Sequence, residues 1–261
     1  MKTVVVPVDF SDTSLNAATY AVNMLSDHDG VEMILYHCFE KNYAADDFEE
    51  KIQALAGDLR KNGNVHISTL AEQGDDLIEE LEKFVRHRQA DLVIMGITGR
   101  TGLGKIFLGS NTIKMAENKV CPVLIIPASC SYNQVKNVLL TSDLENVVST
   151  TPSAPIKNVL NTVKPNLHIV NVNSEHYIDI SEQYDAEREK LKQMFAEYNP
   201  SFYFLRLFDV DEAINQFAED KNIDMLIVVH KDHSMIHKLF NSSHTKNLAY
   251  QSTVPVLVVH E

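Results

Sequence analysis

The sequence predicts an α/β protein made of two tandem, doubly wound, open parallel sheets of five strands each. Three observations predict this fold class. Short apolar runs alternate with longer stretches of mixed polarity along the whole chain. Several of the short runs are apolar on both sides, which is typical of parallel strands covered by helices on each face of a sheet. The alternation also occurs twice, once in each half of the 261 residues.

Each element of the first half follows from its local pattern. The apolar runs predict strands near Thr3–Val8, Glu32–Cys38, Asn64–Leu70, Asp91–Met95 and Val123–Ile126. The periodic stretches between them predict helices near Ser14–Ser26, Asp46–Lys61, Asp75–Arg88 and Ser110–Asn118. The second half is expected to repeat this order, with a strongly charged helix near Ile178–Tyr198 that forms a solvated face.

Two pairs of matching segments carry the repeat. The run DLVIM starting at Asp91 matches DMLIV starting at Asp224, and the runs VCPVLII and TVPVLVV follow them at identical spacing. A unit of about 130 residues is itself the size of a domain. We therefore predict two domains, residues 1–130 and 131–261, joined at the short polar stretch after Pro127.

The composition argues against several classes of protein. A formal net charge of −13 repels a phosphate backbone and no basic block offsets it, so we expect no nucleic-acid partner. The three cysteines, Cys38, Cys121 and Cys130, have no metal-ligand or redox spacing and fit a reducing compartment. No signal-peptide pattern follows Met1, and no apolar run approaches the roughly 20 residues that span a bilayer. We therefore expect a soluble, cytoplasmic protein with no membrane partner.

A glycine-rich loop is the strongest functional signal in the chain. Between the strand at Asp91 and the next helix lie Gly96, Gly99 and Gly109, and Ser110 follows the last of them. Glycines let the backbone approach an anion closely, and a loop that runs into a helix start can surround a phosphate with N–H groups.

The helix start and the loop cations add to this signal. Ser110, Asn111 and Thr112 begin the helix, where N–H groups are unpaired and side chains can add hydrogen bonds. Arg100 and Lys105 lie in the loop, within reach of phosphate oxygens.

The loop also shares an edge with an acid. Asp9 ends the first strand and Gly96 ends the fourth, so both lie where open parallel sheets bind ligands, and Asp9 can accept hydrogen bonds from ribose hydroxyls. The spacing is neither that of the P-loop nor G-x-G-x-x-G. A flexible glycine connection without a ligand is the alternative.

These residues give the chain a resemblance to the universal stress proteins. The motif of the family's adenine-nucleotide-binding subgroup is a glycine, two residues, a glycine, nine residues, a glycine and then serine or threonine. Gly96, Gly99, Gly109 and Ser110 match it, as do the VPVD segment ending at Asp9 and the later run CPVLII. The resemblance implies an adenine nucleotide alpha hydrolase-like, Rossmann-like fold. It also implies a stress-response regulator that binds AMP, or ATP with Mg²⁺.

The resemblance also assigns roles to residues of the first half. Asp9 is expected to contact the ribose, and the backbone around Val8 and Cys38 is expected to frame the adenine. The loop glycines, Ser110 and Asn111 are expected to cradle the phosphates. The complete set expected to bind the cofactor is Pro7, Val8, Asp9, Cys38, Gly96, Gly99, Arg100, Gly109, Ser110, Asn111 and Thr112.

The second half departs from the motif. Val229, Asp232 and Ser242 stand where the first half has Gly96, Gly99 and Gly109, although Asp143 matches Asp9. We interpret this half as a degenerate copy without a nucleotide. The resemblance suggests that the final strands, Val123–Ile126 and Val256–Val259, pair so that the halves form a pseudo-dimer. Further assembly, as a homodimer or with an unidentified protein partner, stays open.

Two other features have competing interpretations. His230, His233, His237 and His244 cluster in the second half and would either share a metal or be exposed polar residues of a loop. Cys38 would either be a thiol whose oxidation modulates binding or an inert buried thiol.

The function predicted overall is regulatory. The leading interpretation is a module that binds ATP or AMP in its first half with little or no catalysis, because no nucleophile pair or carboxylate dyad is visible. One alternative is an enzyme: a slow ATPase, an enzyme that phosphorylates itself on Ser110 or Thr112, or an adenylyl-transferring ligase. The other is an interaction scaffold without a nucleotide.

Overall fold

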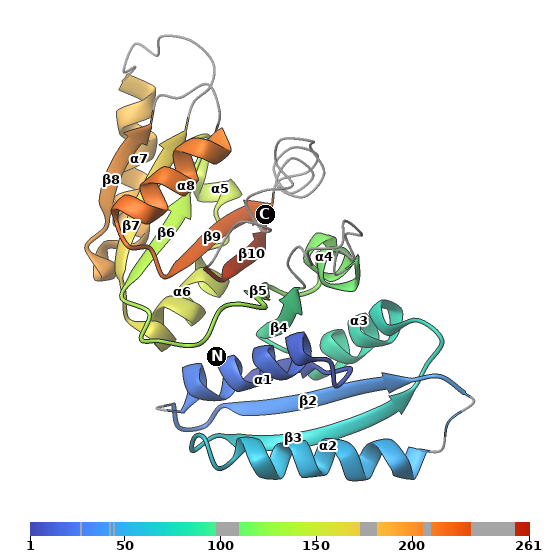
Figure 1. The fold of residues 1–261 in the computed structure, drawn as a ribbon. Coiled ribbons are helices and arrows are strands. Elements are labelled where there is room, and N and C mark those ends of the chain that lie inside the picture. Colours follow the sequence, from blue (N-terminus) through green and yellow to red (C-terminus); the bar gives the residue numbers. More distant parts are fainter. Residues whose placement is uncertain are drawn as a thin grey trace. The chain divides into compact units, whose positions relative to one another are not determined.

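The chain folds into two compact units, Met1–Gln134 and Val135–Glu261. The computed structural model describes residues 1–26, 28–41, 43, 45–97, 110–172, 182–205, 210–230 and 254–261. Within these ranges each unit consists of strands alternating with helices, as Figure 1 shows.

The first unit is a parallel sheet with helices between successive strands. Its elements are, in order, β1 (Thr3–Pro7), α1 (Asp12–Leu25), β2 (Glu32–Phe39), α2 (Ala45–Leu59), β3 (His66–Gln73), α3 (Leu77–Arg88), β4 (Leu92–Ile97), α4 (Ser110–Glu117) and β5 (Val123–Pro127). The strands lie in the order β3-β2-β1-β4-β5, and the pairs within the unit are parallel.

This strand order places a switch point beside β1. The chain passes from β1 outward through β2 to β3, and then returns to place β4 on the opposite side of β1. Val4 faces Met33 of β2 and Leu92 of β4 in the register. The connections after β1 and β4 therefore leave the same edge of the sheet in opposite directions, which opens a crevice where such folds bind ligands.

Local signals in the sequence set the helix ends that border this edge. The hydroxyl of Ser11 accepts the N–H of Ser14 and caps α1. The carboxylate of Asp76 accepts the N–H groups of Ile78 and Glu79 at 2.8 and 3.1 Å, so α3 begins at Leu77 rather than at the expected Asp75.

The core of the first unit lies on both faces of the sheet. The central residues of β1, Val4, Val5 and Val6, are fully buried, and so is Tyr36 of β2. Because both faces of these strands are covered, their side chains are apolar without alternation, as the sequence pattern predicted.

The second unit repeats the plan of the first. Its elements are β6 (Asn137–Thr141), α5 (Val147–Thr150), α6 (Ser153–Val163), β7 (Asn166–Val172), α7 (Glu182–Met194), a 3₁₀ turn (Ala196–Tyr198), β8 (Ser201–Leu205), α8 (Val210–Asp220), β9 (Met225–His230) and β10 (Val256–His260). The strands lie in the order β10-β9-β6-β7-β8 and pair in parallel. The predicted α/β fold, with tandem parallel sheets, is thus confirmed.

One helix of the second unit differs from its counterpart. Where the first unit has the single helix α1, the second has the short α5 followed by α6. Thr151 between them is extended, with φ −105° and ψ 109°. The ring of Pro152 disfavours a helical conformation at the residue before it, which explains the break.

The expectation that the charged stretch of the second unit is only a solvated face is wrong for part of α7. Leu191 is fully buried, and Glu187 is 7% exposed. The carboxylate of Glu187 accepts the N–H of Val147 at 2.8 Å and the ammonium of Lys190 at 2.6 Å. Burial of this glutamate therefore depends on a partner from α5 that a pattern of charges cannot reveal.

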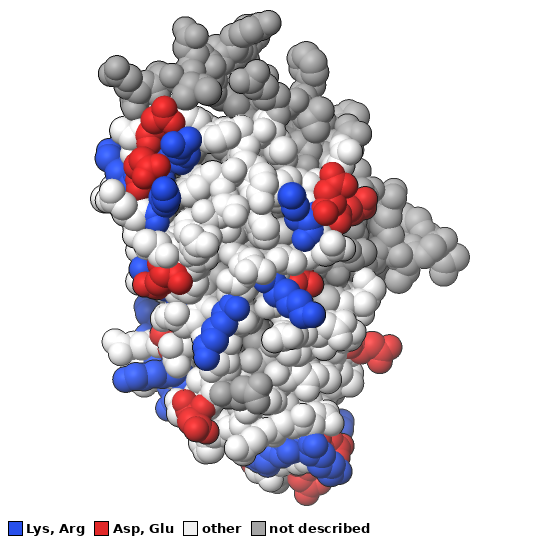
Figure 2. Space-filling view, turned by 90° about the vertical axis from the view of Figure 1, so that its left-hand side faces the viewer, with Lys and Arg blue, Asp and Glu red and all other residues white. Residues whose placement is uncertain are grey.

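The surface carries charge in mixed groups. On the face drawn in Figure 2, lysines and arginines lie close to aspartates and glutamates, with uncharged surface between the groups. Among the described residues, no helix is both long and apolar enough to cross a membrane.

Candidate functional site

The candidate site lies at the carboxyl edge of β1 and β4 in the first unit. Pro7 ends β1, Val8 and Asp9 follow it, and Gly96 is the second-last residue of β4. Ser110 begins α4, which is the next helix after β4. The structure thus places at one edge those predicted residues that it describes, while Gly99, Arg100 and Gly109 lie outside the described residues.

Asp9 is held in place by the turn that leads into α1. One oxygen of its carboxylate, Oδ1, accepts the N–H of Ser11 at 3.0 Å and the hydroxyl of Ser11 at 2.5 Å. Its own N–H donates to the hydroxyl of Ser14 at 3.3 Å. The residue between them, Phe10, has φ +63°, a left-handed conformation that is rare for a bulky side chain and often occurs at functional sites.

This turn favours an ionised carboxylate. Partial burial raises the pKa of Asp9. The hydrogen bonds from Ser11 and Ser14 together lower it by more than burial raises it, so the pKa lies below its ordinary value. Because Oδ1 carries both bonds from Ser11, Oδ2 is the oxygen suited to accept hydrogen bonds from the hydroxyls of a ligand.

Gly96 brings the start of α1 against the end of β4. A methyl group on Gly96 would clash with the carbonyl oxygen of Thr13 and lie 2.7 Å from the Cγ2 atom of Thr13. No residue with a Cβ fits here without a shift of backbone. The absence of a side chain therefore sets how closely the Asp9 turn approaches β4.

Thr112 has a structural contact at the edge. Its hydroxyl donates to the carbonyl oxygen of Gly96 at 2.8 Å, and its side chain is 3% exposed. Ser110 and Asn111 are exposed at the first turn of α4, where backbone N–H groups have no partners within the helix. Of the three polar residues at this helix start, Ser110 and Asn111 are thus the ones open to a phosphate.

A cluster of rings lies beside Val8. The Nδ1 atom of His37 is 2.7 Å from the carbonyl oxygen of Val8, and the ring is 7% exposed. The centroids of Phe10 and Phe48 lie 4.9 and 4.6 Å from that of His37. The sequence motifs assign no binding role to His37 or to either phenylalanine. The signal that could have found His37 is a polar residue inside an otherwise apolar strand.

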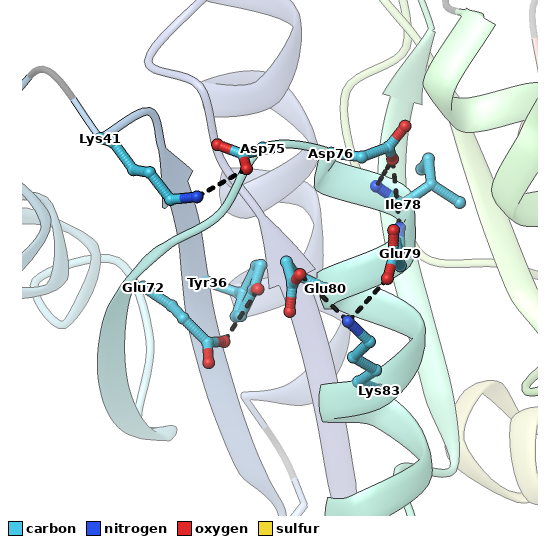
Figure 3. Close-up of polar contacts among 9 residues, drawn as sticks. All are labelled: Tyr36, Lys41, Glu72, Asp75, Asp76, Ile78, Glu79, Glu80 and Lys83. Atoms are coloured by element: carbon cyan, nitrogen blue, oxygen red, sulfur yellow. Dashed lines mark hydrogen bonds and ion pairs between the residues drawn. The ribbon is translucent and has the colours of Figure 1, made fainter.

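The opposite face of β2 is acidic. Figure 3 shows Tyr36 donating to Glu72 and Lys41 paired with Asp75 near the start of α3. Glu80 lies in the same region and pairs with Lys83 on α3. This concentration of carboxylates disfavours a phosphate on the β3 side and leaves the α4 side as the favourable direction.

The environment of Cys38 makes its thiol a poor nucleophile. Partial burial raises the pKa of Cys38 first, and the nearby carboxylates of Glu80 and Glu72 raise it further. A thiol of this kind stays protonated and therefore reacts slowly with oxidants. The structure favours the inert interpretation of Cys38.

The second unit keeps part of the turn. Oδ1 of Asp143 accepts the N–H of Glu145 at 3.1 Å, and Leu144 has φ +56°, as Phe10 does. The buried Asn171 occupies the place of His37 and donates to the carbonyl oxygen of Ser142 at 3.0 Å. Val229 stands where the first unit has Gly96, so the equivalent edge is built differently.

The histidine cluster is only partly described. His230 ends β9 beside His260 of β10, with ring centroids 5.2 Å apart. His233, His237 and His244 lie outside the described residues. Among the residues that the structure does describe, no group of three or more side chains is arranged to hold a metal ion.

The comparisons with known proteins agree with this architecture. The chain matches the model of the universal stress protein family over residues 1–127 and 159–260. It is 28% identical over 138 residues to a universal stress protein of Methanocaldococcus jannaschii, which covers 48% of this chain and 81% of that protein. A universal stress protein of Thermus aquaticus is 29% identical over 137 residues, covering 48% and 98%. A universal stress protein structure from Archaeoglobus fulgidus aligns with a TM-score of 0.74 at 16% identity, over 99% of this chain and 98% of that one.

Proposed function

The chain belongs to the universal stress protein family, and from that premise we propose that its first unit binds an adenine nucleotide, ATP or AMP, at the edge of β1 and β4. The observation that carries the proposal is the ordered Asp9 turn beside Gly96, at the switch point of the sheet. An ionised carboxylate with one oxygen suited to further bonds is the group that a ribose diol needs.

The phosphates belong on the other side of the same edge. Ser110 and Asn111 start α4, and the N–H groups and dipole of a helix start attract anions. Gly96 together with Gly99, Arg100 and Gly109 completes the proposed binding set, with Pro7, Val8 and the backbone at Cys38 on the side of the base. Mg²⁺ would accompany ATP by bridging phosphate oxygens.

We propose regulation, with little or no catalysis, as the role of this site. The pKa of Asp9 is lowered, and a weakly basic carboxylate is poorly suited to activate a water molecule. The buried hydroxyl of Thr112 donates to Gly96, which disfavours self-phosphorylation there and leaves Ser110 as the exposed hydroxyl. The proposed setting is a cytoplasmic response to stress in which the nucleotide sets the state read by a protein partner.

Calorimetric titration of the nucleotide-free protein with ATP and Mg²⁺, and separately with AMP, tests the proposal. We expect one site per chain, and a loss of affinity of roughly tenfold to a hundredfold in Asp9→Ala, because a hydrogen bond to a charged group is removed. The matched control is Asp143→Ala, which removes the corresponding carboxylate of the second unit and should leave binding unchanged.

Two outcomes would contradict the proposal. A wild-type protein that is folded by circular dichroism yet binds neither nucleotide would favour the scaffold alternative. Equal losses of affinity in Asp9→Ala and Asp143→Ala would place a nucleotide in both units.

A further inference from the structure

One buried nitrogen at the proposed site is unexplained by the fold. A carbonyl oxygen only accepts hydrogen bonds, so Nδ1 of His37 must carry the proton that it donates to Val8. The other ring nitrogen, Nε2, then presents a lone pair. It is buried and has no hydrogen-bond partner in the part of the protein that the structure describes. Such an atom is costly to leave unpaired.

The second unit shows what the fold itself requires at this position. There Asn171 donates to the carbonyl oxygen of Ser142, which is the residue that matches Val8. A single donor therefore suffices to tie the second strand of each sheet to the end of the first. Asn171 also carries an acceptor, Oδ1, but the imidazole of His37 places its second nitrogen one bond farther from the backbone, in the unit with the intact glycine motif.

The imidazole that carries this acceptor lies among aromatic rings. The rings of Phe10 and Phe48 lie close to His37, and aromatic rings stack readily on a nucleobase. Phe10 follows Asp9 directly, so the proposed ribose contact and the aromatic surface are adjacent in the chain. Binding sites for small molecules commonly combine an apolar lining with a few convergent polar atoms of this kind.

We propose that Nε2 of His37 accepts a hydrogen bond from the 6-amino group of adenine and makes the site selective for 6-aminopurines. This inference rests on the proposed function. A 6-oxopurine such as hypoxanthine or guanine places an acceptor oxygen at the same point, and two lone pairs then face each other. Discrimination is strong where a buried polar group of the protein is left unpaired by the wrong ligand.

The test compares ATP with ITP, which carries oxygen in place of the 6-amino group. Both are titrated calorimetrically into the wild-type protein, into His37→Asn and into the matched control Asn171→His. The substitution His37→Asn takes the residue that the second unit uses, so it preserves a donor to Val8. Its amide oxygen lies one bond nearer the backbone than Nε2, so the acceptor at the position of Nε2 is lost. Thermal unfolding of each variant confirms that it is folded.

We expect the wild type to bind ATP at least tenfold more tightly than ITP. In His37→Asn the affinity for ATP should fall roughly three- to tenfold, so that the ratio of the two affinities approaches one. Asn171→His should keep the wild-type ratio. As a check that needs no variant, purine riboside triphosphate, which lacks the 6-amino group, should bind the wild type as weakly as His37→Asn binds ATP.

Failure of this inference differs from failure of the proposed function. If the wild type binds ATP and ITP equally, or if His37→Asn keeps the wild-type ratio, nucleotide binding stands and His37 has no part in selecting the base. A buried water molecule would then be the partner of Nε2. If the wild type binds neither nucleotide, the proposed function and this inference are both overturned.

Discussion

At the scale of single residues, Gly96 acts mainly through the side chain that it lacks. The sequence indicates a flexible loop residue that a phosphate could approach. The structure adds a packing role, because the carbonyl oxygen and methyl group of Thr13 occupy the space that a Cβ atom would need. The position of the Asp9 turn relative to β4 therefore depends on this glycine.

Replacing Gly96 by alanine should destabilise the protein by about 1–3 kcal/mol, because the added methyl group forces α1 away from β4. Urea unfolding followed by circular dichroism measures the loss. Gly57→Ala is the matched control, since a Cβ there meets nothing within 4 Å. Alanine favours a helix, so this variant should be up to about 1 kcal/mol more stable than the wild type. A Gly96→Ala protein as stable as the wild type would show that α1 can shift without cost.

Single residues also mark where prediction from sequence ends. The alternation of strands and helices predicted that Asp9 and Gly96 lie at the same edge of the sheet, and the pairing of β1 with β4 agrees with this. The left-handed backbone of Phe10 was not predictable, since phenylalanine rarely adopts it and only the surrounding fold imposes it. The unpaired Nε2 of His37 was equally hidden, because it is left over only once Nδ1 has bonded to the carbonyl oxygen of Val8, which lies just beyond the neighbouring strand.

At the scale of elements, α5 and α7 pack together in a way that the sequence pattern did not predict. The two helices pack together, and Glu187 of α7 accepts the N–H of Val147 at the start of α5. The hydrogen bond from Lys190, and then that from Val147, hold the pKa of Glu187 below its usual value. The buried carboxylate of Glu187 thus holds the start of α5 against α7.

The variant Glu187→Gln should lose about 1 kcal/mol of unfolding free energy at pH 7, because the bonds to a charged acceptor weaken. A lowered carboxyl pKa gives stabilisation that is complete above the ordinary pKa of about 4.3 and lost as the pH falls through the folded-state pKa. The difference between the two proteins should therefore shrink below pH 4. Urea unfolding across pH 3 to 7 measures it.

The control for this prediction is Glu189→Gln on the same helix. Glu189 is half exposed and its ion pairs with Arg188 and Lys192 lie at the surface. This variant should stay within about 0.5 kcal/mol of the wild type at every pH. If Glu187→Gln is equally neutral, the carboxylate contributes nothing to the packing of α5 on α7.

The elements themselves were largely predictable, and the misses have physical causes. The strands of the first half were found with ends that differ by at most three residues, because buried parallel strands are continuously apolar. The start of α3 was misplaced because Asp76 is its cap and Asp75 pairs instead with Lys41. The break between α5 and α6 was missed because the order of the first half was transferred to the second without regard to Pro152.

At the scale of the whole molecule, the same order of strands occurs in both units, but the residues at the carboxyl edge of the sheet differ between them. Both units have the same strand order around a central strand, but the second places Val229 where the first has Gly96. The sequence repeat was enough to predict this plan. The pairing of the final strands of the two halves stays a prediction.

Hydrogen exchange should distinguish the two edges. With saturating ATP we expect slower amide exchange in residues 8–14 and in α4 of the first unit, because a bound ligand stabilises the segments that it contacts. The matching segment of the second unit, residues 142–148, should be unchanged. The variant Asp9→Ala at the same ATP concentration is the control and should show less slowing, because its affinity for ATP is reduced. Equal slowing in both units would contradict a degenerate second edge.

The valine at position 229 has a consequence for how far one half of the repeat could be converted into the other. Its buried side chain occupies the place of a glycine whose bareness lets α1 of the first unit approach β4. Replacing Val229 by glycine would remove buried side-chain volume from β9, while the helix break before Pro152 and the bond between Glu187 and Val147 would stay as they are. One substitution therefore does not convert the second edge into the first, because residues on several elements differ between the two units. The two halves of the repeat are not interchangeable parts, and each edge has to be engineered on its own terms.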